Sequence, residues 1–261
     1  MESVIYAGQK FEEPFLGSSE RRGFILGDGA GVGKGRQLAA MIYDAWRQGH
    51  KKHVWLSISA DLEHDARRDI SDIGVKEMKT FNISNLAYSN LDKNLEGVMF
   101  CTYHSLIMST HSNGKNTVTR RLDQLVEWLG GEDCTGCIVF DEGHKAKNLY
   151  HHQQPSKMGL RVKQLQEMCP NARVVYCSAT PCSEPRNMAY MTRVGLWGPG
   201  TNYEDFQRFL SSVDNRGVGA MELVAIHLKS EGSMLCRTLS YQGCNFDLCE
   251  IGVSDTQVSS W

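Results

Sequence analysis

The chain has 261 residues, the size of one large domain or two small ones. Apolar residues make up 41% of it and charged residues 22%, a globular composition that excludes a mainly disordered or collagen-like chain. The net charge of −2 and the isoelectric point near 6.5 exclude a strongly basic nucleic-acid coat, but they leave room for a local basic face. No run approaches the ~18 apolar residues of a membrane-spanning helix, and the N-terminus lacks the basic and apolar regions of a secretory signal, so we expect a soluble protein with no membrane partner.

Short apolar runs alternate with helical patterns over the first two thirds of the chain. The runs that predict strands lie at residues 23–27, 53–59, 79–83, 98–103, 137–141 and 173–178. The patterns that predict helices lie at residues 34–47, 62–73, 120–129 and 158–168. Because the strand runs are apolar throughout, both faces of the sheet should be buried, which predicts an α/β fold with a parallel sheet flanked by helices. The polar segment 111–119 predicts an exposed loop.

The pattern changes after about residue 185. Helices are predicted at residues 187–196, 203–213 and 218–229, and two short β-like runs follow at 237–241 and 246–251. We therefore expect one α/β domain over residues 1–200 and a mixed helical and β extension over residues 201–261. Because the chain stops at Trp261 without a closing element, we expect it to be a fragment of something longer.

The sequence GFILGDGAGVGKGR at residues 23–36 joins a buried strand to a glycine-rich turn, a lysine and a helix, which is the context of a phosphate-binding loop. The backbone N–H groups of such a turn and the helix N-terminus attract phosphate, and Lys34 would reach the β and γ phosphates. The match to GxxxxGK[ST] departs at two positions, because Asp28 replaces the first glycine and Gly35 replaces the Ser/Thr whose hydroxyl usually contacts Mg²⁺. A glycine-rich turn without a ligand is the alternative. The predicted contacts to ATP in this segment are Asp28, Gly29, Gly31, Gly33, Lys34, Gly35 and Arg36.

The second motif, CIVFDEGH at residues 137–144, ends an apolar strand in two carboxylates. At the carboxyl end of a parallel strand Asp141 could hold Mg²⁺, and Glu142 could polarise the water that attacks the γ-phosphate. A solvated acidic turn is the alternative. A third motif, YCSAT, closes another buried strand with small residues that could couple the nucleotide site to a moving partner lobe. These residues are Ser178, Ala179 and Thr180.

Nine cysteines at irregular spacing argue against a secreted disulfide framework. Cys134 and Cys137 have the spacing of zinc ligands, but no second pair completes a site, and Cys137 opens an apolar run. We expect both to be small buried side chains.

The three motifs in this order resemble the superfamily 2 helicase-like ATPases, and the chain looks like the first RecA-like lobe of a DExH-box protein. More narrowly, GFILGDGAGVGKGR, DEGHKAKN, EPRNMAYMTRVGLWG and RGVGAMELVA resemble the strawberry notch family of nuclear transcriptional regulators, over residues 6 to about 251. In that family the phosphate loop also ends in GKGR, whereas DECH is more frequent than the DEGH of this chain, which has Gly143. The resemblance implies a RecA-like P-loop sheet, ATP and Mg²⁺ as cofactors, a nuclear location, and DNA, RNA, chromatin proteins or transcription factors as partners.

The resemblance also implies roles at matching positions. Gln9 lies upstream of the loop, where such ATPases carry a glutamine that reads adenine; a surface polar residue is the alternative. Thr102 and Tyr103 match a TYxxL element that either contacts the nucleic-acid backbone or supports the lobe. His144 would link the nucleotide site to a second lobe.

Residues 145–173 carry six basic side chains against a single acidic residue, Glu167. They could form a surface for a phosphate backbone or an acidic partner, or a solvated helix face balanced by acids elsewhere in the fold. The basic residues are Lys145, Lys147, Lys157, Arg161, Lys163 and Arg173.

Two functions from different classes agree with these patterns. The first is an ATP-binding, ATP-hydrolysing lobe of a strawberry notch-type nuclear regulator of transcription and chromatin, slow on its own because superfamily 2 enzymes complete the site with arginines from a second lobe. The second is a transcription or chromatin scaffold that uses ATP only as a conformational switch. A small-molecule kinase is disfavoured, because DEGH and SAT have no reason to occur there and no acceptor site is visible.

Overall fold

The computed structural model describes residues 1–15, 18–88, 91–111, 118–143, 156–182, 184–214 and 218–237. Seven strands form one parallel sheet in the order β3-β4-β2-β7-β8-β1-β9, and β5 pairs with β6 in a separate antiparallel ribbon. The strands are β1 (Phe24–Leu26), β2 (Lys52–Ser57), β3 (Thr80–Asn82), β4 (Gly97–Thr102), β5 (Ser109–His111), β6 (Val118–Arg120), β7 (Cys137–Asp141), β8 (Arg173–Cys177) and β9 (Met234–Leu235). The helices are α1 (Glu2–Phe11), α2 (Lys34–Arg47), α3 (Leu62–Asp72), α4 (Arg121–Leu129), α5 (Lys157–Met168), α6 (Phe206–Asp214) and α7 (Val218–Ser230), with short 3-10 turns at η1 (Ile83–Asn85), η2 (Tyr103–Ile107), η3 (Gly131–Asp133) and η6 (Pro185–Met188).

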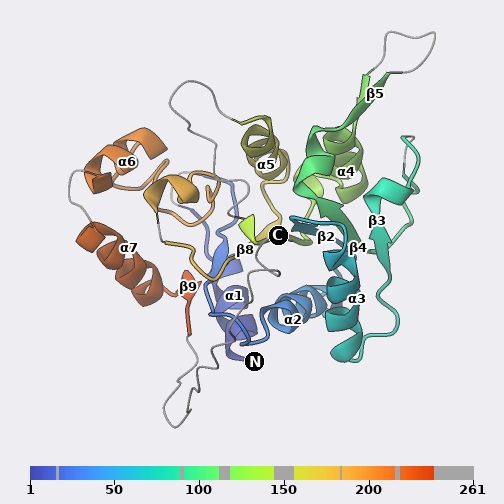
Figure 1. Cartoon of the computed structure of the whole chain (residues 1–261), viewed down its shortest axis with the longest axis horizontal. Helices are drawn as coiled ribbons and strands as arrows, with labels where there is room; N and C mark the ends of the chain where they lie inside the picture. The colour runs from blue at the N-terminus through green and yellow to red at the C-terminus, as the bar shows by residue number, and fades with distance from the viewer. Residues whose placement is uncertain are drawn as a thin grey trace, which may run out of the picture.

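The sheet lies between two layers of helices (Figure 1). Buried residues of α1, α2 and α3 pack against one face, and those of α4, α5, α6 and α7 belong to the core on the other. Side chains alternate between the two cores along each central strand. In β2, Val54 and Leu56 face the core that contains α4–α7, and Trp55 faces the core that contains α1–α3. Both faces are therefore apolar, which explains the uninterrupted apolar runs in the sequence and confirms the predicted parallel α/β sheet.

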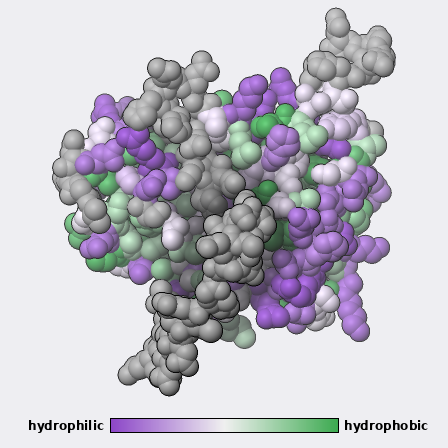
Figure 2. Space-filling model, in the orientation of Figure 1, coloured by the Kyte–Doolittle hydropathy of each residue, from purple (hydrophilic) through white to green (hydrophobic). Residues whose placement is uncertain are grey.

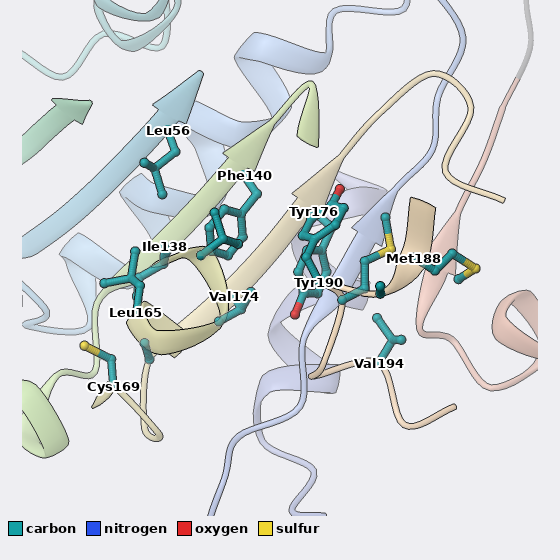
Figure 3. Close-up of a cluster of buried hydrophobic side chains, with 14 of the residues drawn as sticks. Leu56, Ile138, Phe140, Leu165, Cys169, Val174, Tyr176, Met188, Tyr190 and Val194 are labelled. Carbon is teal, nitrogen blue, oxygen red and sulfur yellow. The ribbon is translucent and has the colours of Figure 1, made fainter. Parts of the chain in front are cut away.

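An aromatic cluster fixes the segment after β8 onto the sheet (Figure 3). The rings of Phe140 and Tyr176 stack with centroids 5.7 Å apart, and Tyr190 meets Tyr176 edge-on at 5.7 Å. Contacts of this kind add about 0.5–1.5 kcal/mol each beyond the area that they bury. They place Tyr190 beside the carboxyl end of β7, where the acidic pair lies.

The six predicted strands and four predicted helices of the first two thirds are confirmed to within two residues at each end. The helices predicted at 203–213 and 218–229 are confirmed as α6 and α7. Helix α1 and strand β9 were not expected. Because β9 pairs with β1, residues beyond 200 contribute an edge strand to the main sheet. None of the helices in the described residues is long and apolar enough to cross a membrane.

The helix predicted at residues 187–196 is wrong, because only η6 is helical there and turns follow it. Arg193 gives the physical reason. Its side chain is fully buried, and its guanidinium donates hydrogen bonds to backbone carbonyls before β1, in the last turn of α5 and just after α5. These carbonyls belong to Arg21, Gln166, Cys169 and Pro170. Gly195 follows with φ 80° in the left-handed region, so the chain cannot continue as a helix.

The exposed loop predicted at 111–119 is wrong at both ends, since β5 and β6 extend into it and pair through Thr110 and Thr119. Residues 112–117 between them lie outside the described residues, as do residues 238–251, which include most of the two predicted β-like runs.

One buried histidine gives a test of this fold. His53 of β2 is fully buried; its Nδ1 accepts a hydrogen bond from the backbone N–H of Cys137 at 3.0 Å, and its Nε2 lies 2.8 Å from the carbonyl of His50. Burial lowers the pKa of His53 to about 3, although the hydrogen bond to the His50 carbonyl favours the charged form. The imidazole is thus neutral in the folded state but takes up a proton in the unfolded state below about pH 6.5.

We expect stability to fall as the pH drops through this range, since the unfolded state then binds the extra proton. In His53→Asn the amide oxygen can accept from Cys137 without titrating. Between pH 7 and about pH 5, the free energy of unfolding measured by urea denaturation should fall by roughly 2 kcal/mol less in the variant than in the wild type, at 1.36 kcal/mol per pKa unit. Parallel pH profiles would contradict the assignment.

Candidate functional site

The carboxyl ends of four parallel strands lie level with one another. In the register of the sheet, Leu26 of β1 pairs with Cys177 of β8, and Cys177 pairs with Asp141 of β7. Strand β2 ends at Ser57, whose hydroxyl donates to Asp141 at 3.3 Å. The glycine-rich turn after β1 therefore begins at the same edge as Asp141. From β1 the chain runs through α2 to β2, which lies beyond β8 and β7. From β8 it runs in the opposite direction, to β9 on the other side of β1. Open parallel sheets bind ligands at such a point, where the connections from two adjacent strands leave in opposite directions.

The backbone of the glycine-rich turn has the shape of an anion-binding loop. Gly31 and Gly33 adopt φ values of 78° and 77°, which glycine reaches without strain. Gly33 is the N-cap of α2, so the first N–H groups of that helix lack intrahelical partners at the turn. Lys34 is half-buried, and its Nζ donates to the carbonyl of Gly29 at 3.3 Å. These groups together suit a phosphate.

Asp28, predicted as a contact to ATP, is fully buried. Its carboxylate accepts hydrogen bonds from Nε2 of Gln37 at 2.9 Å and from the guanidinium and backbone N–H of Arg237 at 2.6 and 2.9 Å. Burial raises the pKa of Asp28, but the hydrogen bonds from Arg237 and Gln37 outweigh it and leave the pKa below its usual value. The carboxylate thus anchors the turn to α2 and to the chain after β9. Arg36, also predicted as a contact to ATP, is exposed and pairs with Asp72 of α3 at 2.5 Å.

Asp141 is the residue best placed to hold a cation. Its Oδ2 accepts from Ser57 and lies 3.5 Å from Nε1 of Trp55. Burial and the adjacent charge of Glu142 raise the pKa of Asp141, against hydrogen bonds from Trp55, Cys177 and Ser57. Asp141 is half-buried, and a partly desolvated carboxylate next to another acid is costly unless a cation compensates it. Carboxylate oxygens are the ligands that Mg²⁺ prefers, so the residue fits a magnesium site.

Glu142 has a strained backbone, with φ 48°, unlike any other non-glycine residue in the described part of the chain. Such strain costs about 1–3 kcal/mol and persists where the surroundings enforce it, often at functional sites. Gly143 follows in a crowded place: a Cβ there would lie 2.1 Å from the hydroxyl of Tyr190. Gly143 therefore leaves room for Tyr190, whose buried hydroxyl finds no hydrogen-bond partner among the described residues.

The TYxxL element lies behind the acidic pair. Tyr103 is buried, and its hydroxyl donates to the backbone carbonyl of Asp141 at 3.0 Å. Thr102 is the N-cap of η2 and forms a capping box with Ser105. These contacts favour the lobe-support alternative over a direct contact with nucleic acid.

The remaining predicted site residues differ in burial, and only some of them have a described place. Ser178 is buried, and its N–H donates to the carbonyl of Leu26 at 3.1 Å, so the SAT segment starts beside the glycine-rich turn. Ala179 and Thr180 are exposed. Gln9 is exposed on α1, and adenine recognition by it stays a prediction. His144 lies outside the described residues.

The basic segment 145–173 is less free than its composition suggests. Lys163 pairs with Glu167 at 3.3 Å, and Arg173 is buried at the start of β8. Lys145 and Lys147 lie outside the described residues. The contacts that the structure describes favour balanced charge over an open basic surface.

The predicted burial of Cys134 and Cys137 is confirmed. The side chain of Cys134 is hydrogen-bonded to that of Cys169, a residue outside the CTGC motif, and not to that of Cys137. In the described ranges no group of three or more His, Cys, Asp and Glu residues could by itself hold a metal ion.

A groove of about 650 Å³ with both apolar and polar walls is lined by the 194–203 segment and by helices α6 and α7, and by no residue of the glycine-rich turn. Its walls include Leu196, Tyr203, Val213 and Leu228. It contains none of the predicted site residues.

The comparisons with known proteins agree with this geometry. The family model for the P-loop containing NTP hydrolase pore-1 matches residues 1–261. The chain belongs to this family. It is 48% identical over 256 residues to Protein FORGETTER 1 of Arabidopsis thaliana, covering 96% of this chain and 19% of that protein. It is 45% identical over 268 residues to Protein strawberry notch homolog 1 of Homo sapiens, covering 100% of this chain and 19% of that protein. The resemblance to the strawberry notch proteins is thereby confirmed, and the chain spans about a fifth of the length of these relatives.

Among solved structures, the SWI2/SNF2 ATPase core of Sulfolobus solfataricus in complex with dsDNA resembles the chain with a TM-score of 0.57 and 17% identity, over 83% of this chain and 40% of that one. This likeness confirms that the chain has the predicted RecA-like α/β fold.

The anchor between Asp28 and Arg237 leads to a stability prediction. Arg237→Met leaves a buried carboxylate with Gln37 as its remaining side-chain donor, and an unsatisfied buried acceptor costs about 1–3 kcal/mol. We expect a loss of this size at pH 7 in chemical denaturation. Because the pKa of Asp28 is lowered in the folded state, the loss should shrink as the pH falls through that pKa and the carboxylate takes up a proton.

The matched control is Arg208→Met, which removes a pair with Glu204 between side chains that are 68% and 71% exposed. Such surface pairs contribute about 0–1 kcal/mol. Equal stabilities of the two variants would show that Arg237 is not an anchor.

Proposed function

We propose that the chain binds Mg-ATP at the carboxyl edge of its sheet and hydrolyses it. The observation that carries this proposal is the register that places the glycine-rich turn, Lys34 and Asp141 at one edge, level with one another. Lys34 and the turn amides would hold the phosphates, and Asp141 would hold Mg²⁺, which would supply neutralisation of phosphate charge during transfer.

The chain's own residues supply the remaining chemistry. Glu142 orients and polarises the attacking water. Its left-handed backbone conformation sets the direction in which its side chain leaves the backbone. Tyr103 and Ser57 position Asp141 from behind. His144 and the 178–180 segment pass the state of the site to a second lobe. Arginines from that lobe complete the site, and since arginine stabilisation of a phosphoryl-transfer transition state is worth roughly 10³–10⁵ in rate, this chain alone hydrolyses ATP slowly.

At the level of the whole protein, we propose a nuclear regulator of transcription and chromatin. The similarity to strawberry notch proteins supports this role, with chromatin proteins or transcription factors as partners. The SWI2/SNF2 core that shares the fold was solved in complex with dsDNA, which favours DNA over RNA as the nucleic-acid partner.

The second candidate is a scaffold that uses ATP only as a conformational switch. The anchor between Asp28 and Arg237 supports it, because the arginine ties the glycine-rich turn to the chain that leaves the sheet after β9. A change in the turn on nucleotide binding would reach that segment directly.

The test is calorimetric titration of Mg-ATP into this chain and into its Lys34→Ala variant. Hydrogen bonds from charged groups contribute about 1.5–3 kcal/mol, so the substitution should weaken binding roughly 10- to 100-fold. Lys163→Ala on α5, which removes an exposed lysine paired with Glu167, should bind as the wild type does. No binding by the wild type, or equal binding by Lys34→Ala, would contradict the proposal.

Hydrolysis separates the two candidates. Glu142→Gln should keep nucleotide binding and abolish hydrolysis. If the full-length protein then loses function in a transcription assay, it acts as an enzyme. If it tolerates Glu142→Gln but not Lys34→Ala, it acts as a switch.

A further inference from the structure

The glycine at position 35 has a charged neighbour from another helix. A Cβ on Gly35 would lie 1.8 Å from Oδ2 of Asp69 and 2.9 Å from its Cγ. Asp69 belongs to α3, which packs against α2 along the first helical layer. Its carboxylate thus fills the space that the side chain of residue 35 would take.

This is the position where a phosphate-binding loop usually carries a Ser/Thr hydroxyl that contacts Mg²⁺. A hydroxyl oxygen would lie one bond beyond the Cβ of residue 35. Since Oδ2 of Asp69 lies only 1.8 Å from that Cβ position, an oxygen is still present at this part of the turn, and it comes from α3.

The other acidic residues of α3 have partners: Glu63 is partly buried and accepts hydrogen bonds from Arg67 and Asn82, and the other two form ion pairs at the surface. Asp65 pairs with Arg68 at 2.8 Å and Asp72 pairs with Arg36 at 2.5 Å, and hydrophilic side chains gather over α3 at the right of Figure 2. The side chain of Asp69 is only 13% exposed. Its Oδ1 lies 3.7 Å from Arg68, beyond hydrogen-bond distance, and Oδ2 has no donor among the described residues.

We propose that Asp69 supplies, from α3, the magnesium-facing oxygen that Gly35 lacks. The inference rests on the proposed binding of Mg-ATP and adds to it a second carboxylate, at the Gly35 side of the turn. Mg²⁺ in nucleotide sites is typically held by one or two carboxylates together with phosphate oxygens and water.

A carboxylate in place of a hydroxyl has a distinct consequence. Without Mg²⁺ its negative charge repels the triphosphate, and with Mg²⁺ it attracts the ion. Asp69 therefore makes ATP affinity depend more strongly on Mg²⁺, because it weakens binding without the ion and strengthens binding with it. A residue that only held α2 against α3 would change both affinities together.

The experiment titrates ATP into the chain in Mg²⁺ and in EDTA and compares the ratio of the two dissociation constants. Loss of even an outer-shell partner of a metal typically costs 10–100-fold in metal affinity. We therefore expect Asp69→Ala and the isosteric Asp69→Asn to reduce the ratio about tenfold or more. In Asp69→Asn the affinity in EDTA should rise. The double variant Gly35→Ser/Asp69→Ala should recover much of the ratio, because a hydroxyl returns at position 35.

Asp65→Ala is the matched control, since it removes a surface acid of the same helix, one turn away, and should keep the wild-type ratio. Thermal melting of each variant checks that it is folded. If Asp69→Ala does not fold, the comparison is made with Asp69→Asn alone. An unchanged ratio in Asp69→Asn, with ATP still bound, would overturn this inference and leave the proposed function standing. A wild type that binds no ATP in either condition would overturn the proposed function itself.

Discussion

The pairing of β8 between β7 and β1 determines how the rest of the molecule is used. It places Asp141, Cys177 and Leu26 side by side in one row, so a turn that leaves β1 and an acidic pair that leaves β7 meet at a single edge. The two helical layers bury both faces of these strands, and neither segment can shift along the sheet without exposing apolar side chains to the wrong core. The candidate site residues are thus positioned by the buried centre of the sheet.

Side chains from distant segments then adjust the edge. Arg237 reaches back to Asp28, Tyr103 supports Asp141, and Asp69 enters from α3 beside Gly35. In each case a polar group that the turn or the acidic pair needs is supplied from another element. The two departures of the glycine-rich turn from the usual pattern, Asp28 and Gly35, are each explained by such a partner. Under the proposed function, the turn is an altered phosphate loop whose two changes are compensated by residues distant in sequence.

An element of this fold could be predicted from the sequence where its pattern lies within its own residues, and not where it depends on distant contacts. The central strands have apolar cores with polar residues near their ends, and α2 and α3 have clear helical spacing, so their bounds could be read from the sequence. The apolar spacing after residue 185 reflects burial of Tyr190, Met191 and Val194 in turns, a pattern that spacing alone cannot distinguish from a helix. Strand β9 has two residues and forms only by pairing with β1. The helix α1 did carry a signal, since Ala7 and Phe11 lie four residues apart on one face.

The site divides in the same way. The glycines, Lys34 and the acidic pair lie next to strand ends and could be predicted, because parallel strands end at a common edge. The partner of Asp28 is 209 positions away, and the approach of Asp69 to Gly35 depends on how α3 packs on α2. No local pattern contains either contact.

Hydrogen exchange of the backbone amides, measured in this chain with and without saturating Mg-ATP, tests the central claim most directly. Binding at the sheet edge predicts slower exchange at residues 29–36, where the turn amides and the start of α2 would contact phosphate, with little change in α4 on the opposite layer. If Mg-ATP leaves residues 29–36 unchanged and protects instead the groove lined by α6 and α7, the glycine-rich turn is not the nucleotide site.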